Sequence, residues 1–224
     1  AVAGFPVDST KDGLVNKDRH FYGVNVLLGT FFDRLNALLF FVNQRTAGVT
    51  DRQAIGAEIR YADDKVAAFT LLDYDIAYDN LNMFLFVGSW KIRPKTSLNL
   101  TLDYRNSPLL MTTNAIQGQG VERVDDLFLT YTRDEIFDLA EDRTARAKTG
   151  TFGISQELND RLQLAGEFTI TDTGPTIASG GVEAAEATGK EYFYSMQLIA
   201  SSLWMENDIS TFELRYSDTN RNNI

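Results

Sequence analysis

The clearest pattern in the sequence is SLNLTLDYR, residues Ser97–Arg105, whose side chains alternate between polar and apolar at every step. Leucine and tyrosine occupy the even positions, whereas polar and charged residues occupy the odd positions from Asn99 onward. Successive side chains of a β-strand point to opposite faces. The pattern therefore predicts a strand with one apolar face and one polar face.

The same alternation recurs clearly in Arg161–Thr171 and Ile209–Ser217. Leu38–Val42 and Leu81–Val87 are apolar on both faces, so the alternation is imperfect there. We predict ten strands of about ten residues, joined alternately by tight and long connections. Their expected ranges are His20–Thr30, Arg34–Gln44, Gln53–Tyr61, Lys65–Tyr78, Leu81–Lys91, Ser97–Arg105, Arg143–Gln156, Arg161–Thr171, Lys190–Trp204 and Ile209–Ser217. The fold class is all-β, an antiparallel up-and-down meander that must close or leave exposed edges.

Residues 106–142 interrupt the meander with apolar residues at helical spacing. Thr132 and Glu135 match a capping box, which marks the start of a helix. We predict two short amphipathic helices in this long loop, Val121–Tyr131 and Arg133–Glu141. A loop with its own secondary structure is more often functional than a plain connector.

The composition excludes several kinds of chemistry. The 224 residues include no cysteine and one histidine, His20, and carry a formal net charge of −10. Disulfides, thiolate ligands and a two-histidine metal site within the chain are therefore excluded. The acidic balance argues against a nucleic-acid partner, because phosphate binding needs clustered lysine and arginine.

No catalytic arrangement stands out, and we predict no enzymatic activity, no cofactor and no metal site. Residues 118–120 lack the third glycine of a dinucleotide fingerprint. His20 is interpreted as a structural or solvated residue. Asp73 and Asp75 share a strand face. They could act as a general acid–base pair or bind a cation. We interpret them instead as charges that line a lumen or face solvent.

Three features favour a transmembrane barrel: strands long enough to span a bilayer, alternating short and long connections, and aromatic residues near strand ends. The aromatic residues form a predicted girdle at the two membrane interfaces. Its members are Tyr22, Phe31, Phe32, Tyr61, Tyr74, Trp90, Tyr104, Tyr192, Tyr194, Trp204 and Tyr216.

Charged residues within the strands are predicted to line the lumen of such a barrel. They are Glu58, Arg60, Asp73, Asp75, Asp103, Arg105, Arg146, Lys148, Glu167, Glu213 and Arg215. In a soluble barrel the faces would be reversed, with the charges in water and the apolar residues inside. The alternative function is thus a soluble binding module with an apolar ligand cavity.

With tight turns in the periplasm, Ala1–Arg19 and Asp218–Ile224 would both lie at the long-loop end. A complete outer-membrane barrel normally keeps both termini in the periplasm. We therefore expect residues 1–224 to form a single barrel domain or the interior part of a wider one.

Five stretches resemble the barrel region of large Gram-negative outer-membrane proteins that carry tetratricopeptide repeats before the barrel. They are GFPVDST (Gly4–Thr10), LLDYDIAYDNLN (Leu71–Asn82), LDYRNSPLLMTTNAIQGQ (Leu102–Gln119), DEIFDLAEDRTA (Asp134–Ala145) and ASGGVEA (Ala178–Ala184). The resemblance implies a location in the outer membrane, the lipid bilayer as a partner, and further strands or a periplasmic repeat region in the same protein. Relatives with this layout often export polymers or assemble surface material, which implies a pore or export scaffold. No functional residue is carried over.

Overall fold

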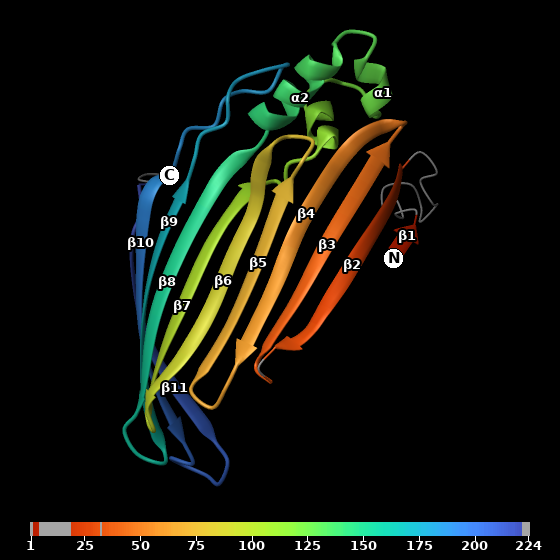
Figure 1. Cartoon of the computed structure of the whole chain (residues 1–224). Helices are drawn as coiled ribbons and strands as arrows, with labels where there is room; N and C mark the ends of the chain where they lie inside the picture. The colour runs from red at the N-terminus through yellow and green to blue at the C-terminus, as the bar shows by residue number, and fades with distance from the viewer. Residues whose placement is uncertain (1, 5–18, 32, 221–224) are drawn as a thin grey trace.

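A computed structural model describes residues 2–4, 19–31 and 33–220 of the chain (Figure 1). Its strands form one antiparallel sheet in which each strand pairs with its neighbours in sequence. The strands are β1 (Val2–Gly4), β2 (Arg19–Phe31), β3 (Leu35–Thr46), β4 (Val49–Ala62), β5 (Val66–Asp75), β6 (Asn80–Arg93), β7 (Thr96–Ser107), β8 (Ala145–Glu157), β9 (Leu162–Thr173), β10 (Gly189–Ser201) and β11 (Ile209–Asp218). The predicted all-β meander of ten long strands is confirmed, and the curved sheet is not closed.

Most predicted strand ends lie within two residues of the observed ones, and the three exceptions have physical causes. β4 begins at Val49 rather than Gln53, because its pairing with β3 continues past a bulge to a two-residue turn. β5 ends at Asp75 rather than Tyr78, because the Asp75 carboxylate accepts the backbone N–H groups of Ala77 and Tyr78 and so forms a turn. β10 ends at Ser201 rather than Trp204, because the following residues form a turn.

The register assigns every strand residue to one of two faces. We call the face of Leu98, Leu100, Leu102 and Tyr104 the apolar face, and the opposite face the polar face. Directly paired residues share a face, so the apolar face can be followed from β2 to β11 without interruption. One exposed apolar-face residue from each of the ten long strands illustrates this: Val24, Leu39, Ile59, Leu72, Trp90, Leu100, Phe152, Leu164, Met196 and Phe212.

Among the described residues, the sheet has no apolar core beneath it. The buried hydrophobic residues of its strands are three alanines, Ala54, Ala145 and Ala200. The ten apolar-face side chains named above are exposed instead, from 37% at Leu164 to 61% at Phe212. The sheet therefore presents an apolar surface that nothing in the described structure covers.

The buried core lies in the insertion, which we call the cap. It consists of a 3₁₀-helix, η1 (Thr112–Ile116), and two α-helices, α1 (Val124–Leu127) and α2 (Arg133–Asp142). Its core cluster contains Leu110, Ala115, Leu127, Ile136, Leu139 and Ala140, together with Tyr78 from the β5–β6 connection, and Val124 of α1 is also buried. The cap therefore folds around its own small core at one end of the sheet, above β4–β8 (Figure 1).

The predicted helices differ in how well they match the structure. The capping box is confirmed, because Thr132 and Glu135 accept each other's backbone N–H groups at the start of α2. The first helix is much shorter than predicted. It ends at Leu127, because the following residues form a turn in which the backbone N–H groups of residues 128–130 donate to the carbonyls three residues earlier. The η1 segment was not predicted.

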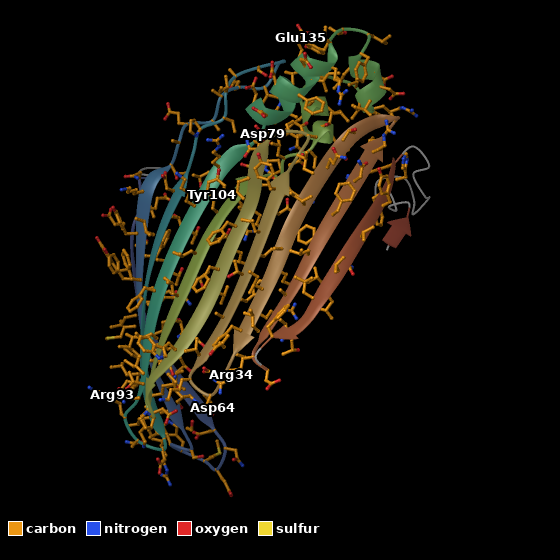
Figure 2. The ribbon with its side chains drawn as sticks, viewed as in Figure 1. Arg34, Asp64, Asp79, Arg93, Tyr104 and Glu135 are labelled. Atoms are coloured by element: carbon orange, nitrogen blue, oxygen red, sulfur yellow. The ribbon has the colours of Figure 1, made fainter. Side chains whose placement is uncertain are left out.

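The two ends of the sheet differ in their connections. Figure 2 shows Arg34, Asp64 and Arg93 in tight turns at one end, and Asp79 and Glu135 at the other. We call these the turn end and the cap end. The predicted alternation of tight and long connections is present only in part. At the cap end the β7–β8 and β9–β10 connections are long, whereas β3 and β4 are joined there by two residues, Ala47 and Gly48.

Candidate pore-lining face and its cap

The polar face carries ion pairs within single strands. Glu58 pairs with Arg60 on β4, Asp103 with Arg105 on β7, and Glu213 with Arg215 on β11, the last at 2.7 Å. Each pair joins residues i and i+2, which share a face of a strand. The polar face thus presents both signs of charge together on three strands.

A further ion pair crosses between strands near the cap end. Arg52 of β4 pairs with Asp73 of β5 and lies 3.9 Å from the Asp75 carboxylate. All three side chains are largely buried, so this cluster stiffens the wall beneath the cap rather than facing open solvent.

The register places eight of the eleven predicted lumen residues in the strand body of the polar face. They are Glu58, Arg60, Asp73, Asp103, Arg105, Glu167, Glu213 and Arg215. Asp75 shares this face but is fully buried at the end of β5. Glu167, Ser195 and Arg215 lie side by side on β9, β10 and β11 and line a groove of about 600 Å³.

Arg146 and Lys148 are a correction to the prediction. They pair with Asn106 and Tyr104 and so lie on the apolar face. The sequence carried the signal, since Phe152 and Ile154 have the same phase along β8.

One row of directly paired apolar-face residues shows where this face changes character. Its members from β2 to β10 are Val26, Leu39, Ala57, Leu72, Phe84, Tyr104, Lys148, Asp172 and Lys190. The row begins with aliphatic residues, continues through two aromatic residues and ends with charges of alternating sign. On later strands the apolar residues therefore lie closer to the turn end. The apolar zone thus crosses the rows of directly paired residues at an angle.

Nine of the predicted girdle residues lie on the apolar face. They are Tyr22, Phe31, Tyr61, Tyr74, Trp90, Tyr104, Tyr192, Tyr194 and Tyr216. Trp204 belongs to neither face, because it lies in the β10–β11 turn beyond the last strand pair, which agrees with its predicted position near a strand end. Phe32 lies outside the described residues.

The cap is held to the wall through a β-bulge on β4. Gln44 pairs with Arg52 and Arg45 with Thr50, which leaves Asp51 as the extra residue. A bulge re-aims a side chain, and here the Asp51 carboxylate accepts the backbone N–H of Thr113 at 2.8 Å. The same carboxylate accepts from Gln44, and Asp51 is 1% exposed.

A second bulge, on β6, holds the same cap segment. Asp73 pairs with Met83 and Tyr74 with Leu81, so Asn82 is the extra residue. Asn82 accepts the backbone N–H of Leu110 at 3.0 Å and donates to the Leu110 carbonyl at 3.3 Å. The sequence analysis missed Asp51 and Asn82, although the non-alternating polar run around Asp51 is a signal of a bulge.

The long β9–β10 connection is joined to the cap by Arg143 and Gln119. The Arg143 guanidinium donates to the Gln117 carbonyl at 3.1 Å and to the Ser179 hydroxyl at 2.9 Å. Gln119 donates to the Gly180 carbonyl at 2.7 Å. Sequence reasoning did not identify this connection, because its residues are far apart in the chain.

The described residues contain no group of three or more potential metal ligands. His20 lies near the start of β2, opposite Arg45 of β3 in the strand register. Asp73 and Asp75 lie three strands away, on β5. Within the described ranges, no helix has the length and apolar character needed to cross a membrane.

Comparison with protein-family models, curated proteins and solved structures finds no match to this chain.

Proposed function

We propose that this chain forms the wall of a transmembrane β-barrel in the outer membrane of a Gram-negative bacterium. In this proposal the apolar face contacts lipid, the polar face lines an aqueous lumen, and the barrel serves as a pore or export scaffold for surface material. The cap would then stand over the long-loop opening of the lumen.

The observation that carries the proposal is an exposed apolar face, continuous over ten strands, in a sheet without an apolar core of its own. A compact water-soluble protein of this size exposes about 10,000 Å², whereas this chain exposes 14,550 Å². Leaving a large aliphatic or aromatic side chain in water forgoes about 1.5–3 kcal/mol each. Lipid removes that cost because it is as apolar as the face itself.

The dimensions of the apolar face also support the proposal. On β2 the face runs from Tyr22 to Phe31, nine residues apart, which is about 30 Å along the strand. A tilt of about 35–45° reduces this to a height of about 21–25 Å, close to the apolar band of outer-membrane barrels.

The unpaired edges require further strands in this setting. β11 has no described neighbour on its outer side, and β1 covers β2 only at Phe21–Gly23. Open sheet edges do not occur within the hydrocarbon region of a bilayer. We therefore propose that additional strands, from the same protein or from an assembled partner, complete the barrel.

The alternative, a soluble binding module, places the same leucines in a closed apolar interior. In the structure the sheet is open, and Leu100, Leu102 and Leu164 are exposed. This exposure favours the membrane proposal over the alternative.

The test compares Leu100→Arg with Thr101→Arg, neighbouring substitutions on the two faces of β7. An arginine facing lipid near the bilayer midplane costs about 2–4 kcal/mol, so Leu100→Arg is expected to reduce the free energy of unfolding in lipid vesicles by that amount. Thr101→Arg faces the lumen and is expected to cost much less.

Purification of the unsubstituted chain without detergent is the accompanying experiment. A folded, monodisperse chain in buffer alone would overturn the membrane proposal and support the soluble module. Equal costs for the two arginine variants in vesicles would likewise contradict the assigned orientation of the faces.

A further inference from the structure

The β10–β11 turn differs from the other described turns at the turn end. Those turns are dominated by charged and polar residues, as in Asp63–Lys65, Arg93–Lys95 and Asn159–Arg161. The β10–β11 turn instead presents three consecutive large apolar side chains. Leu203 is 52% exposed, Trp204 77% and Met205 74%.

Polar side chains of the turn hold its backbone in one shape. The Asp208 carboxylate accepts the backbone N–H groups of Leu203 at 2.7 Å and Trp204 at 3.0 Å. The Ser202 hydroxyl accepts the backbone N–H of Asn207 at 3.1 Å. Ser202 and Asn207 also adopt positive φ angles of 51° and 66°, as tight turns require.

The arrangement is the reverse of an ordinary solvated turn. Its polar groups accept hydrogen bonds from the backbone, while more than half of the surface of each of its three large apolar side chains is exposed. Holding Leu203, Trp204 and Met205 outward in water would be unfavourable, because each forgoes the free energy of burial. A fixed backbone that displays them is useful only if an apolar or interfacial environment receives them.

The position of the turn indicates which environment this is. Trp204 lies three residues beyond Ser201, the last paired residue of β10, and so just past the turn-end edge of the apolar face. Trp90 lies nearest the same edge on β6, within the strand. Tryptophan is enriched at the headgroup level of membranes, where an apolar ring with a polar N–H is favoured.

We propose that the β10–β11 turn is a membrane anchor whose Leu203, Trp204 and Met205 insert into the headgroup–acyl boundary of the leaflet at the turn end. This inference rests on the proposed function, since it assigns a lipid partner to one turn of the same barrel. It makes Asp208 a positioning residue, which directs the three side chains by fixing the backbone.

The chain's two tryptophans make a direct test possible. Trp90→Phe leaves Trp204 as the single fluorophore, and Trp204→Phe leaves Trp90. Each full-length variant is reconstituted into phosphatidylcholine vesicles, with or without bromine on the acyl chains. We expect brominated lipid to quench both tryptophans, with about a twofold or greater loss of emission for Trp204 at the interface.

The outcomes separate this inference from the proposed function. Quenching of Trp90 without quenching of Trp204 would overturn the anchor and leave the membrane barrel standing, with the turn in water or on a protein partner. Absence of quenching at both would overturn both proposals.

Asp208→Ala, made in each single-tryptophan background, tests the positioning role. Loss of the two N–H acceptors is expected to reduce the quenching of Trp204 while that of Trp90 stays unchanged, which also confirms that the sheet has inserted. Unchanged quenching of both tryptophans would show that Asp208 does not position the anchor.

Discussion

Phe31 of β2 and Tyr216 of β11 lie on one unbroken row of directly paired residues that crosses all ten long strands. The residues between them are Leu35, Tyr61, Ala68, Gly88, Leu100, Phe152, Phe168 and Tyr194. Phe31 is at the turn end of its strand, whereas Tyr216 is near the cap end of its own. A single hydrogen-bonded row therefore joins opposite borders of the apolar face.

The shift of this row from the turn end of β2 to the cap end of β11 can be converted into a tilt of the strands relative to the barrel axis. If Tyr22 and Tyr216 mark the same membrane level, the level shifts by nine residues over nine strand spacings. With about 3.3 Å per residue and about 4.8 Å between strands, the tilt is about 35°. That value agrees with the tilt of about 35–45° found in transmembrane barrels.

The first prediction concerns depth in the membrane. Single cysteines introduced at positions 22, 31 and 216 can carry nitroxide labels without competition, because the chain has no native cysteine. In lipid vesicles, labels on Tyr22→Cys and Tyr216→Cys are expected at equal depth from the same surface. The label on Phe31→Cys should report the opposite surface, although Phe31 shares its row with Tyr216. Depth is read from accessibility to apolar and polar relaxation agents.

Equal depth for the Phe31→Cys and Tyr216→Cys labels, with a different depth for Tyr22→Cys, would contradict the tilted belt. In that case the membrane level would follow the hydrogen-bonded rows, which no closed barrel of tilted strands permits.

The sequence predicts the ten strands well because the alternation in Ser97–Arg105 and its counterparts is a local property. The prediction for Arg146 and Lys148 was wrong, because it assigned both residues to the lumen by their charge and ignored that they share a strand face with Phe152 and Ile154 of β8. The polar run around Asp51 indicates an irregular strand, but the exact positions of the bulges at Asp51 and Asn82 depend on the pairing of one strand with another, which the sequence does not show. The oblique course of the girdle depends on register across all strands, which no single strand's sequence contains.

The second prediction concerns the attachment of the cap. Asp51→Ala removes the acceptor of the Thr113 backbone N–H and leaves Gln44 and Arg19 without their shared carboxylate. We expect a loss of about 1–3 kcal/mol, since buried polar groups are left unsatisfied. Hydrogen exchange should accelerate at Thr113 and in η1, while the central strands β7–β9 keep their protection.

Asp51→Asn is the matched variant for this cap attachment. It retains one side-chain oxygen as an acceptor and is expected to preserve most of the protection at Thr113. Uniform acceleration across η1 and the central strands would mean that Asp51 stabilises the whole sheet rather than the cap alone.

The third prediction concerns the junction between the cap and the β9–β10 connection. Arg143→Met keeps an unbranched side chain of similar length but cannot donate to Gln117 or Ser179. Residues 174–188 should then be cleaved faster by a protease specific for glutamate, which acts at Glu183 and Glu186. Arg161→Gln, in the β8–β9 turn at the opposite end, is the control and should leave cleavage unchanged. Equal cleavage of Arg143→Met and the unsubstituted chain would show that the Arg143 hydrogen bonds are not needed to hold the connection.

The last prediction concerns pH and the β4–β5 turn, which lies outside the strands. The Tyr61 hydroxyl, followed by the backbone N–H groups of Lys65 and Val66, lowers the pKa of Asp63 from 3.8 to about 2. A carboxyl whose pKa is lower in the folded state contributes stability above its unfolded pKa and loses it as the pH falls through the folded pKa. The turn is therefore expected to loosen between about pH 4 and pH 2.

Carboxyl-carbon NMR of Asp63 and amide exchange of Val66 over this pH range measure the effect in the turn directly. In Asp63→Asn the side chain no longer titrates, so exchange at Val66 should lose its dependence on this carboxyl. Asp64→Asn is the matched control, because Asp64 lies in the same turn and Asp63 remains to titrate. An Asp63 titration midpoint near 4 would refute the prediction, since the Tyr61 and backbone hydrogen bonds would then add nothing to the charged form.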